Sequence, residues 1–137
     1  MALTRMEHYL VLTDDVRATR DFYVDVLGMS EGFRPPMEFP GYWLYVDGTP
    51  CIHIGDWNAY QSHGDAAGLS VSPRAPGTGP VDHIAFNATD HDGMVALLKH
   101  RGIAHGRNAV PAIGLQQIFV HDPNGVKIEL NYMPQNS

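Results

Sequence analysis

Three things are scarce in this sequence, and each narrows what the protein can be. It has a single cysteine, Cys51, so it cannot form an internal disulfide, which agrees with a reducing compartment. Only nine of the 137 residues are Lys or Arg, against fifteen Asp and Glu, and a formal net charge of −6 argues against a nucleic-acid or anionic-membrane surface. No apolar run approaches membrane-spanning length, and the opening residues lack the pattern of a signal peptide. We therefore expect a cytoplasmic protein with neither nucleic acid nor membrane as a partner.

Length and composition indicate one ordinary globular domain. A chain of 137 residues can bury one sizeable core, and contents of 44% hydrophobic and 18% charged residues are usual for a globular protein. A repeated pattern divides the chain into two modules, residues 5–55 and 81–133. Residues 56–80 between them read as a linker, with one helical turn around residues 57–62 and a later part dense in Gly, Pro and Ser. We expect residues 1–137 to form a single domain built from these two modules.

Two stretches that lie far apart in the chain carry the repeated pattern. Residues 7–12 and residues 81–87 are each rich in strand-forming residues, and each contains one histidine, His8 or His83. Both stretches are followed by a helical run that ends at a glycine and, later, by a short apolar strand. Such a repeat of one supersecondary unit is a primary clue to the fold.

Each repeated unit has the order strand, helix, strand, strand, strand. In the first module Thr13 or Asp14 can cap the helix, Gly28 can end it, and Asp47-Gly48 is a strong hairpin signal. The remaining strands of the first module are expected at residues 30–34, 42–46 and 51–54. In the second module we expect a helix at residues 90–101, which buries Met94, Leu97 and Leu98. Its later strands are expected at residues 104–108, 115–121 and 126–130, with residues 122–125 as the last turn. The predicted fold class is therefore α+β, with two tandem βαβββ modules.

Strand alternation predicts a mixed face and an aliphatic face. On the last strand Val126, Ile128 and Leu130 point one way, and Glu129 points the other way. The faces that carry no helix combine imidazole, carboxylate, aromatic and amide side chains: His8, Trp43, Tyr45, Cys51, His53, His83, Ala85, Asn87, Gln117, Phe119, Lys127 and Glu129. We expect this mixed face to line a cleft.

Four side chains of the mixed face are suited to a metal ion. Superposing the modules sets His8 opposite His83 and His53 opposite Glu129. Neutral imidazole and carboxylate suit zinc, iron, manganese, nickel or cobalt, and two histidines with one carboxylate leave positions open for a substrate. A lone strand histidine is more often a core or surface residue, so the repeat is what favours metal binding. The other histidines are expected to be solvated: His63, His91, His100, His105 and His121. Of these, His63 and His105 can approach a cleft.

Three runs of residues resemble the vicinal oxygen chelate superfamily. They are residues 16–23 together with Leu27-Gly28, residues 83–86, and residues 122–129 with their Asp-Pro-Asn-Gly…Glu signature. This superfamily includes glyoxalases, fosfomycin-resistance transferases, methylmalonyl-CoA epimerases, extradiol dioxygenases and metal-free bleomycin-binding proteins. The resemblance covers nearly the whole chain, and it does not specify a reaction.

The resemblance implies both a fold and a metal site. In this superfamily paired βαβββ modules form a cup-shaped, curved mixed sheet around a divalent ion. By this resemblance His8, His83 and Glu129 occupy the three most commonly used ligand positions, and His53 occupies the fourth, where glyoxalases typically carry Glu and epimerases Gln. The metal would act as a Lewis acid on neighbouring oxygens of a substrate. Because the superfamily commonly pairs modules between chains, we also expect a homodimer.

The leading hypothesis is a divalent-metal enzyme of isomerase, lyase or epimerase type that acts on a small substrate with vicinal oxygens. Glu129 and His53 are its candidate catalytic residues, and His53 is either a ligand or a base. One alternative is an extradiol-type Fe(II) dioxygenase, although Phe119 stands where those enzymes usually show Tyr. The other is a non-catalytic dimer that binds a drug or aromatic ligand, as bleomycin-resistance proteins do. We expect the substrate pocket to be formed by Arg34, Trp43, Tyr45, Asn87, Gln117 and Phe119.

Overall fold

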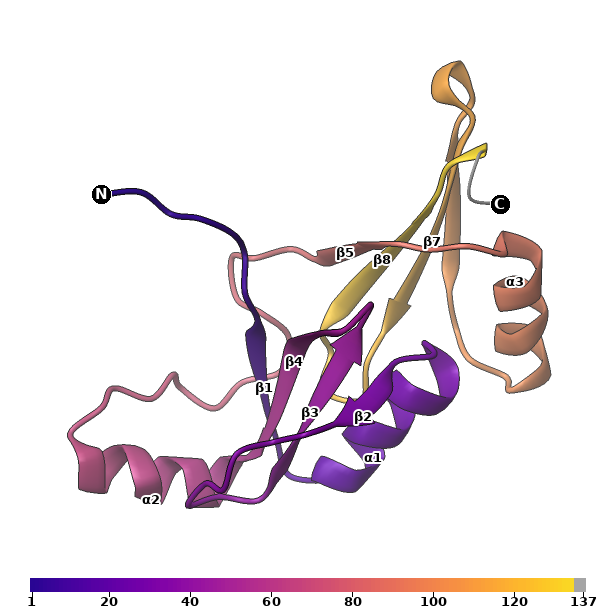
Figure 1. The fold of residues 1–137 in the computed structure, drawn as a ribbon. Helices are drawn as coiled ribbons and strands as arrows, with labels where there is room; N and C mark the ends of the chain where they lie inside the picture. The colour runs from indigo at the N-terminus through magenta and orange to yellow at the C-terminus, as the bar shows by residue number, and fades with distance from the viewer. Residues whose placement is uncertain (135–137) are drawn as a thin grey trace. The chain divides into compact units, whose positions relative to one another are not determined.

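The computed structural model describes residues 1–134 of the chain. These residues form two compact units, of which one comprises Met1–Ala75 and the other begins at Pro76 (Figure 1). That the two units act as a single domain stays a prediction.

The first unit contains four strands and three helical segments. In chain order they are β1 (Tyr9–Thr13), α1 (Val16–Asp21), the π-helical segment η1 (Phe22–Val26), β2 (Ser30–Gly32), β3 (Gly41–Val46), β4 (Thr49–Asp56) and α2 (Trp57–Ala67). The second unit contains β5 (Ile84–Asn87), α3 (His91–His100), β6 (Gly106–Val110), the short 3₁₀ helix η2 (Pro111–Ile113), β7 (Leu115–His121) and β8 (Lys127–Tyr132).

The two units share one sheet topology. The strand order is β1-β4-β3-β2 in the first unit and β5-β8-β7-β6 in the second. In each sheet the first and last strands of the unit pair in parallel, and the other neighbours are antiparallel. This arrangement confirms the predicted α+β fold with two βαβββ modules.

The first helix begins one residue later than we predicted. Its N-cap is Asp15, whose side chain accepts a hydrogen bond from the backbone N–H of Ala18. Thr13 and Asp14 were wrong as caps, because the Thr13 hydroxyl is instead engaged with the Asp15 N–H, and this bond turns the chain from β1 into the helix. Gly28 has φ +79° and follows the helical segment directly, as predicted.

The hairpin between β3 and β4 follows the sequence prediction. Asp47 and Gly48 both have positive φ, 48° and 78°. Two such residues in succession form the turn whose twist matches that of paired antiparallel strands. The turn brings Trp43 of β3 into register with His53 of β4.

The linker contains more structure than we predicted. Instead of one turn, residues 57–67 form the three-turn helix α2. Asp56 caps it by accepting a hydrogen bond from the Ala59 N–H, and Gly68, with φ 71°, ends it. Gly64 is buried in this helix, and a side-chain carbon there would meet Val71 of the following loop, so glycine leaves room for that loop. The cap at Asp56 was the local signal that we missed.

Two strand boundaries and the buried face of the helix differ from the prediction in the second unit. β6 begins at Gly106, two residues after the predicted start, and β8 continues to Tyr132. On α3 the buried residues are Val95 and Leu98, whereas Met94 and Leu97 are half-buried. The alternation predicted for β8 is confirmed: its buried residues are Ile128, Leu130 and Tyr132.

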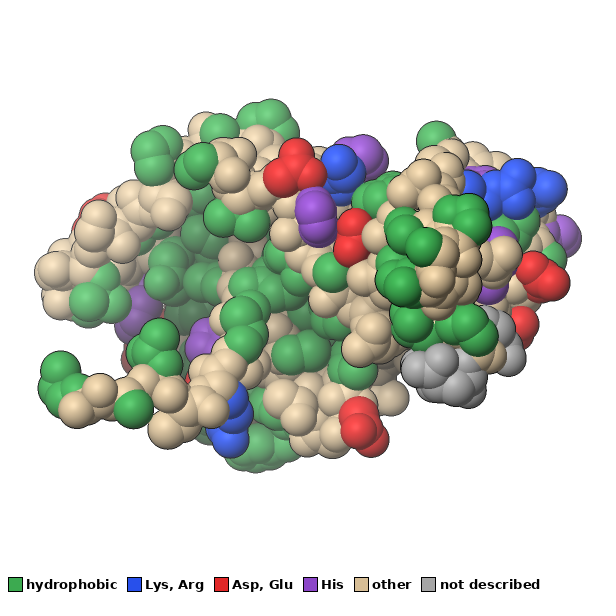
Figure 2. Space-filling model, turned by 90° about the horizontal axis from the view of Figure 1, so that it is seen from above, with side chains coloured by type: hydrophobic (Ala, Val, Ile, Leu, Met, Phe, Trp, Pro, Cys, Tyr) green, Lys and Arg blue, Asp and Glu red, His purple; other side chains and the backbone are tan. Residues whose placement is uncertain are grey.

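Each unit has its own core on the helix-packed face of its sheet. The first contains the fully buried side chains of Tyr23, Leu44, Ile52 and Ile54, and the second those of Leu98, Ile118, Val120, Ile128 and Tyr132. No described helix is long and apolar enough to cross a membrane. On the face drawn in Figure 2, the described Lys and Arg side chains lie in separate small groups.

Candidate metal centre and substrate site

The two predicted ligand histidines occupy matching places in the two units. His8 comes immediately before β1 and His83 immediately before β5, whereas we had placed both inside the strands. In each case Nδ1 lies close to the carboxylate of the preceding residue, at 2.9 Å from Glu7 Oε1 and 2.8 Å from Asp82 Oδ2. A carboxylate that accepts a hydrogen bond from Nδ1 orients the imidazole and leaves the lone pair of Nε2 available to bind a metal ion.

His53 is the middle ring of a three-ring stack in the first unit. Its ring lies 3.7 Å from that of His8 and 4.0 Å from that of Trp43, with interplanar angles of 15° and 6°. The Pro50 carbonyl oxygen, 3.1 Å from His53 Nε2, can only accept, so Nε2 carries the proton and Nδ1 has a free lone pair. Burial, aided by the nearby His8, lowers the pKa of His53 below its usual value. His53 is therefore held in the neutral form that a metal ligand or a general base requires.

His83 and Glu129 meet in the second unit. His83 Nε2 and Glu129 Oε1 are 3.5 Å apart, and the Glu129 side chain is only 13% exposed. The pairing of β5 with β8 sets Ala85 beside Glu129, so the histidine two residues earlier reaches back to the carboxylate. The pairing of these neighbouring strands thus brings an imidazole nitrogen and a carboxylate oxygen face to face.

A chain of side-chain amides leads to Glu129. Asn108 donates to Gln117 at 2.8 Å, Gln117 donates to Asn131 at 3.0 Å, and Asn131 donates to Glu129 Oε2 at 2.9 Å. These bonds fix the orientation of the carboxylate and leave Oε1 directed at His83. Gln117, which we assigned to the substrate pocket, is therefore placed in contact with the second unit's donor pair through Asn131.

Asp82 links His83 to a cation. Its carboxylate contacts both His83 and Lys127 Nζ, the latter at 3.1 Å, and the hydrogen bond from His83, followed by that from Lys127, lowers the pKa of Asp82. The same ammonium group lies 5.5 Å from the ring centroid of Phe119. Sequence reasoning missed Glu7 and Asp82, although an acidic residue directly before each candidate ligand histidine was visible in the sequence.

The remaining predicted pocket residues have separate surroundings. Trp43 forms the wall of the histidine stack, and the Tyr45 hydroxyl donates to the Phe33 carbonyl at 2.6 Å. Asn87 is exposed at the end of β5, and Phe119 lies in register with Glu129. Arg34 donates from Nη2 to the Phe39 carbonyl at 2.7 Å.

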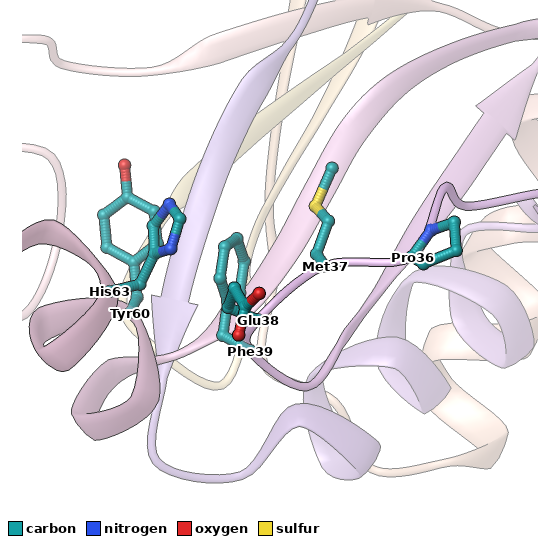
Figure 3. Close-up of a pocket in the computed structure, with 6 residues that line it drawn as sticks. All are labelled: Pro36, Met37, Glu38, Phe39, Tyr60 and His63. Atoms are coloured by element: carbon teal, nitrogen blue, oxygen red, sulfur yellow. The ribbon is translucent and has the colours of Figure 1, made fainter. Parts of the chain in front are cut away.

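A cavity of about 500 Å³ lies in the first unit, between α2 and the loop before β3. It is lined by Pro36, Met37, Glu38, Phe39, Tyr60 and His63 (Figure 3). Of these, only His63 had been singled out in the sequence as able to approach a cleft.

His91, expected to be solvated, instead has a side chain only 11% exposed, because its ring packs edge-on against Tyr132.

The donor chemistry of the two pairs fits a divalent transition metal. No group of three or more His, Cys, Asp or Glu side chains that could hold a metal is found among residues 1–134; the candidate ligands stand as one pair in each unit. The pairs offer imidazole nitrogens and one carboxylate, the donors that zinc, iron, manganese, nickel and cobalt accept.

Two βαβββ units that each carry a pair of metal-competent side chains at matching positions define a class, the vicinal oxygen chelate fold. The family model described as "Glyoxalase/Bleomycin resistance protein/Dioxygenase superfamily" matches residues 5–130, and the chain belongs to this family. It is 32% identical over 132 residues to "Glyoxylase I 4" of Arabidopsis thaliana, covering 93% of this chain and 70% of that protein.

Solved structures show the same fold. A lactoylglutathione lyase from Agrobacterium tumefaciens superposes with a TM-score of 0.66 at 21% identity, covering 96% of this chain and 95% of that one. A glyoxalase/bleomycin resistance protein/dioxygenase from Nocardioides superposes with a TM-score of 0.68 at 19% identity, covering 100% and 88%. The family model and the relative from Arabidopsis thaliana confirm the family resemblance expected from the sequence, and the solved structures confirm the fold.

Proposed function

We propose that the protein is a divalent-metal-dependent enzyme of isomerase, lyase or epimerase type that acts on a small substrate with vicinal oxygens. The observation that carries this proposal is the matched pair of donors in each unit, His8 with His53 and His83 with Glu129. The similarity to "Glyoxylase I 4" supports the assignment of the chain as an enzyme of this type. A bound metal ion would supply Lewis-acid stabilisation of charge that develops on substrate oxygens.

The residues of the chain have separable roles in this proposal. Glu129, oriented by Asn131, and His83, oriented by Asp82, present a carboxylate oxygen and an imidazole nitrogen. His53 is neutral and has a free lone pair on Nδ1, so it can serve as the fourth ligand or accept a proton from the substrate. The aromatic ring of Trp43 covers one side of His53 and excludes water there.

Metal analysis of the purified protein tests this proposal first. One transition-metal ion per site is expected, with zinc, iron, manganese, nickel and cobalt all within the chemistry of the donors. Oxygen uptake with catechols then separates the candidates, because an Fe(II) dioxygenase consumes oxygen and a lyase or isomerase does not. A protein that takes up no transition metal would support a non-catalytic binding function instead.

Asp82→Asn is expected to weaken metal affinity by about 10–100-fold, because loss of the carboxylate frees the His83 ring and lowers its basicity. The affinity is measured by competition with a chelator of known strength. Asp92→Asn is the matched control, since Asp92 makes the same adjacent contact with His91, at 3.0 Å, but at the start of α3. Equal effects of the two variants would remove Asp82 from the metal site.

We further propose a homodimer in the cytoplasm. This proposal rests on the resemblance to the vicinal oxygen chelate superfamily, in which modules are commonly paired between chains, and a two-fold interface of that kind is isologous. Light scattering of the metal-loaded protein at micromolar concentration should give twice the monomer mass. A monomeric result would leave the metal ligands to be supplied within one chain.

A further inference from the structure

The cavity in the first unit contains aromatic rings that already contact one another. The Phe39 ring lies 5.0 Å from the Tyr60 ring, nearly perpendicular to it, and 5.4 Å from the His63 ring. Figure 3 shows Tyr60 and His63 projecting from α2 toward Phe39, with Met37 and Pro36 further along the loop. These rings together present an aromatic surface to the cavity, against which another flat ring can stack or pack edge-on.

The Phe39 ring is held in place from two sides. Arg34 donates to the Phe39 carbonyl, and its guanidinium lies 5.1 Å from the centre of the ring. Gly55 lies beneath the ring, where a side-chain carbon would come within 3.1 Å of Phe39 Cε2. Arg34 is therefore a positioning residue for the cavity wall, and Gly55 provides the space that the ring occupies.

Three polar groups line the cavity and are open to solvent, because Glu38 is exposed and Tyr60 and His63 are half-buried. They are the Tyr60 hydroxyl, the His63 imidazole and the Glu38 carboxylate, each of which lines the cavity. A pocket that is mostly apolar and has a few convergent polar groups is the usual form of a small-molecule site. The carboxylate can only accept hydrogen bonds, so it favours a ligand with an O–H donor and repels an anion.

We propose that this cavity is a binding site for the ring of a neutral hydroxyl-bearing aromatic compound of the phenol class. The ring lies against Phe39 and Met37, and its hydroxyl group exchanges hydrogen bonds with Glu38, Tyr60 and His63. The proposal goes beyond the proposed function, because none of the four candidate metal ligands lines this cavity.

Phenol itself is the probe, and the readout is NMR of protein labelled at the methionine methyl groups. Met37 lines the cavity, whereas Met29 is buried in the same unit and serves as the internal control. Phenol should shift the Met37 resonance saturably and leave Met29 unchanged. Benzoate, which Glu38 repels, and cyclohexanol, which lacks an aromatic ring, should each bind at least about tenfold more weakly.

Variants in the same loop test the assignment. Phe39→Ala should weaken phenol binding at least about tenfold, while Phe33→Ala, which removes a 73% exposed ring outside the cavity, should leave it unchanged. If Phe39→Ala does not fold, Tyr60→Phe replaces it and should weaken phenol binding severalfold. Unchanged binding in both cavity variants, or equal binding of phenol, benzoate and cyclohexanol, would overturn the proposal.

The titration is made both with and without a chelator. Phenol should bind equally in metal-free protein, because the cavity and the donor pairs share no residue. Phenol binding in a protein that never takes up metal would refute the proposed enzyme and support the cavity. Stoichiometric metal without phenol binding would do the reverse.

Discussion

Replacing His83 or Glu129 by alanine should abolish stoichiometric metal binding while leaving the chain folded. Each change removes one member of the donor pair whose atoms lie 3.5 Å apart, and neither side chain belongs to the apolar core. Each variant lacks one of the three principal ligands, His8, His83 and Glu129, and the remaining donors are too few to hold a transition metal at micromolar concentration. The measurement is elemental analysis after gel filtration, with circular dichroism to verify the fold.

His121→Ala is the control for these variants. His121 is exposed at the end of β7 in the same unit, and its removal should leave the metal content unchanged. Full occupancy in either His83→Ala or Glu129→Ala would show that the ligand assignment is wrong. His53→Gln provides a graded comparison: it should weaken affinity less than His83→Gln, because His8, His83 and Glu129 already suffice for an open metal site whereas His53 is either a fourth ligand or a base.

Ile52→Ala should destabilise the protein by about 2–5 kcal/mol, the usual cost of truncating a buried isoleucine. The Ile52 side chain is 0% exposed and lies at the centre of its sheet, where β4 pairs with Tyr9 on one side and Leu44 on the other. The loss should therefore form a cavity in the first unit, directly beside His53 in the chain. Urea unfolding followed by tryptophan fluorescence measures it, since both tryptophans, Trp43 and Trp57, belong to this unit.

Ile113→Ala is the matched control for the stability measurement. Its side chain is 55% exposed, so the same truncation removes little buried surface and should change the free energy of unfolding by about 0.5 kcal/mol or less. A cost below about 1 kcal/mol for Ile52→Ala would mean that the first unit's core is packed differently from the structure.

Local patterns in the sequence determined much of the fold. Alternation alone identified the buried residues Ile128 and Leu130 of β8 and set Glu129 on the opposite face, because successive side chains of a strand point to opposite sides. Asp47-Gly48 predicted a hairpin because both residues tolerate positive φ. The family resemblance followed from motifs of the same local kind.

Contacts between distant segments were decided only by the tertiary structure. The stack of His8, His53 and Trp43 joins residues before β1, on β4 and on β3, and its spacing depends on strand register that no single stretch of sequence encodes. The cavity is of the same kind, since Phe39 meets Tyr60 only because the loop before β3 packs against α2. The sequence by itself thus determined which residues could form strands, turns and candidate ligands. Which of them touch was decided by long-range packing, because a side chain's neighbours are set by the folded surface and not by its place in the chain.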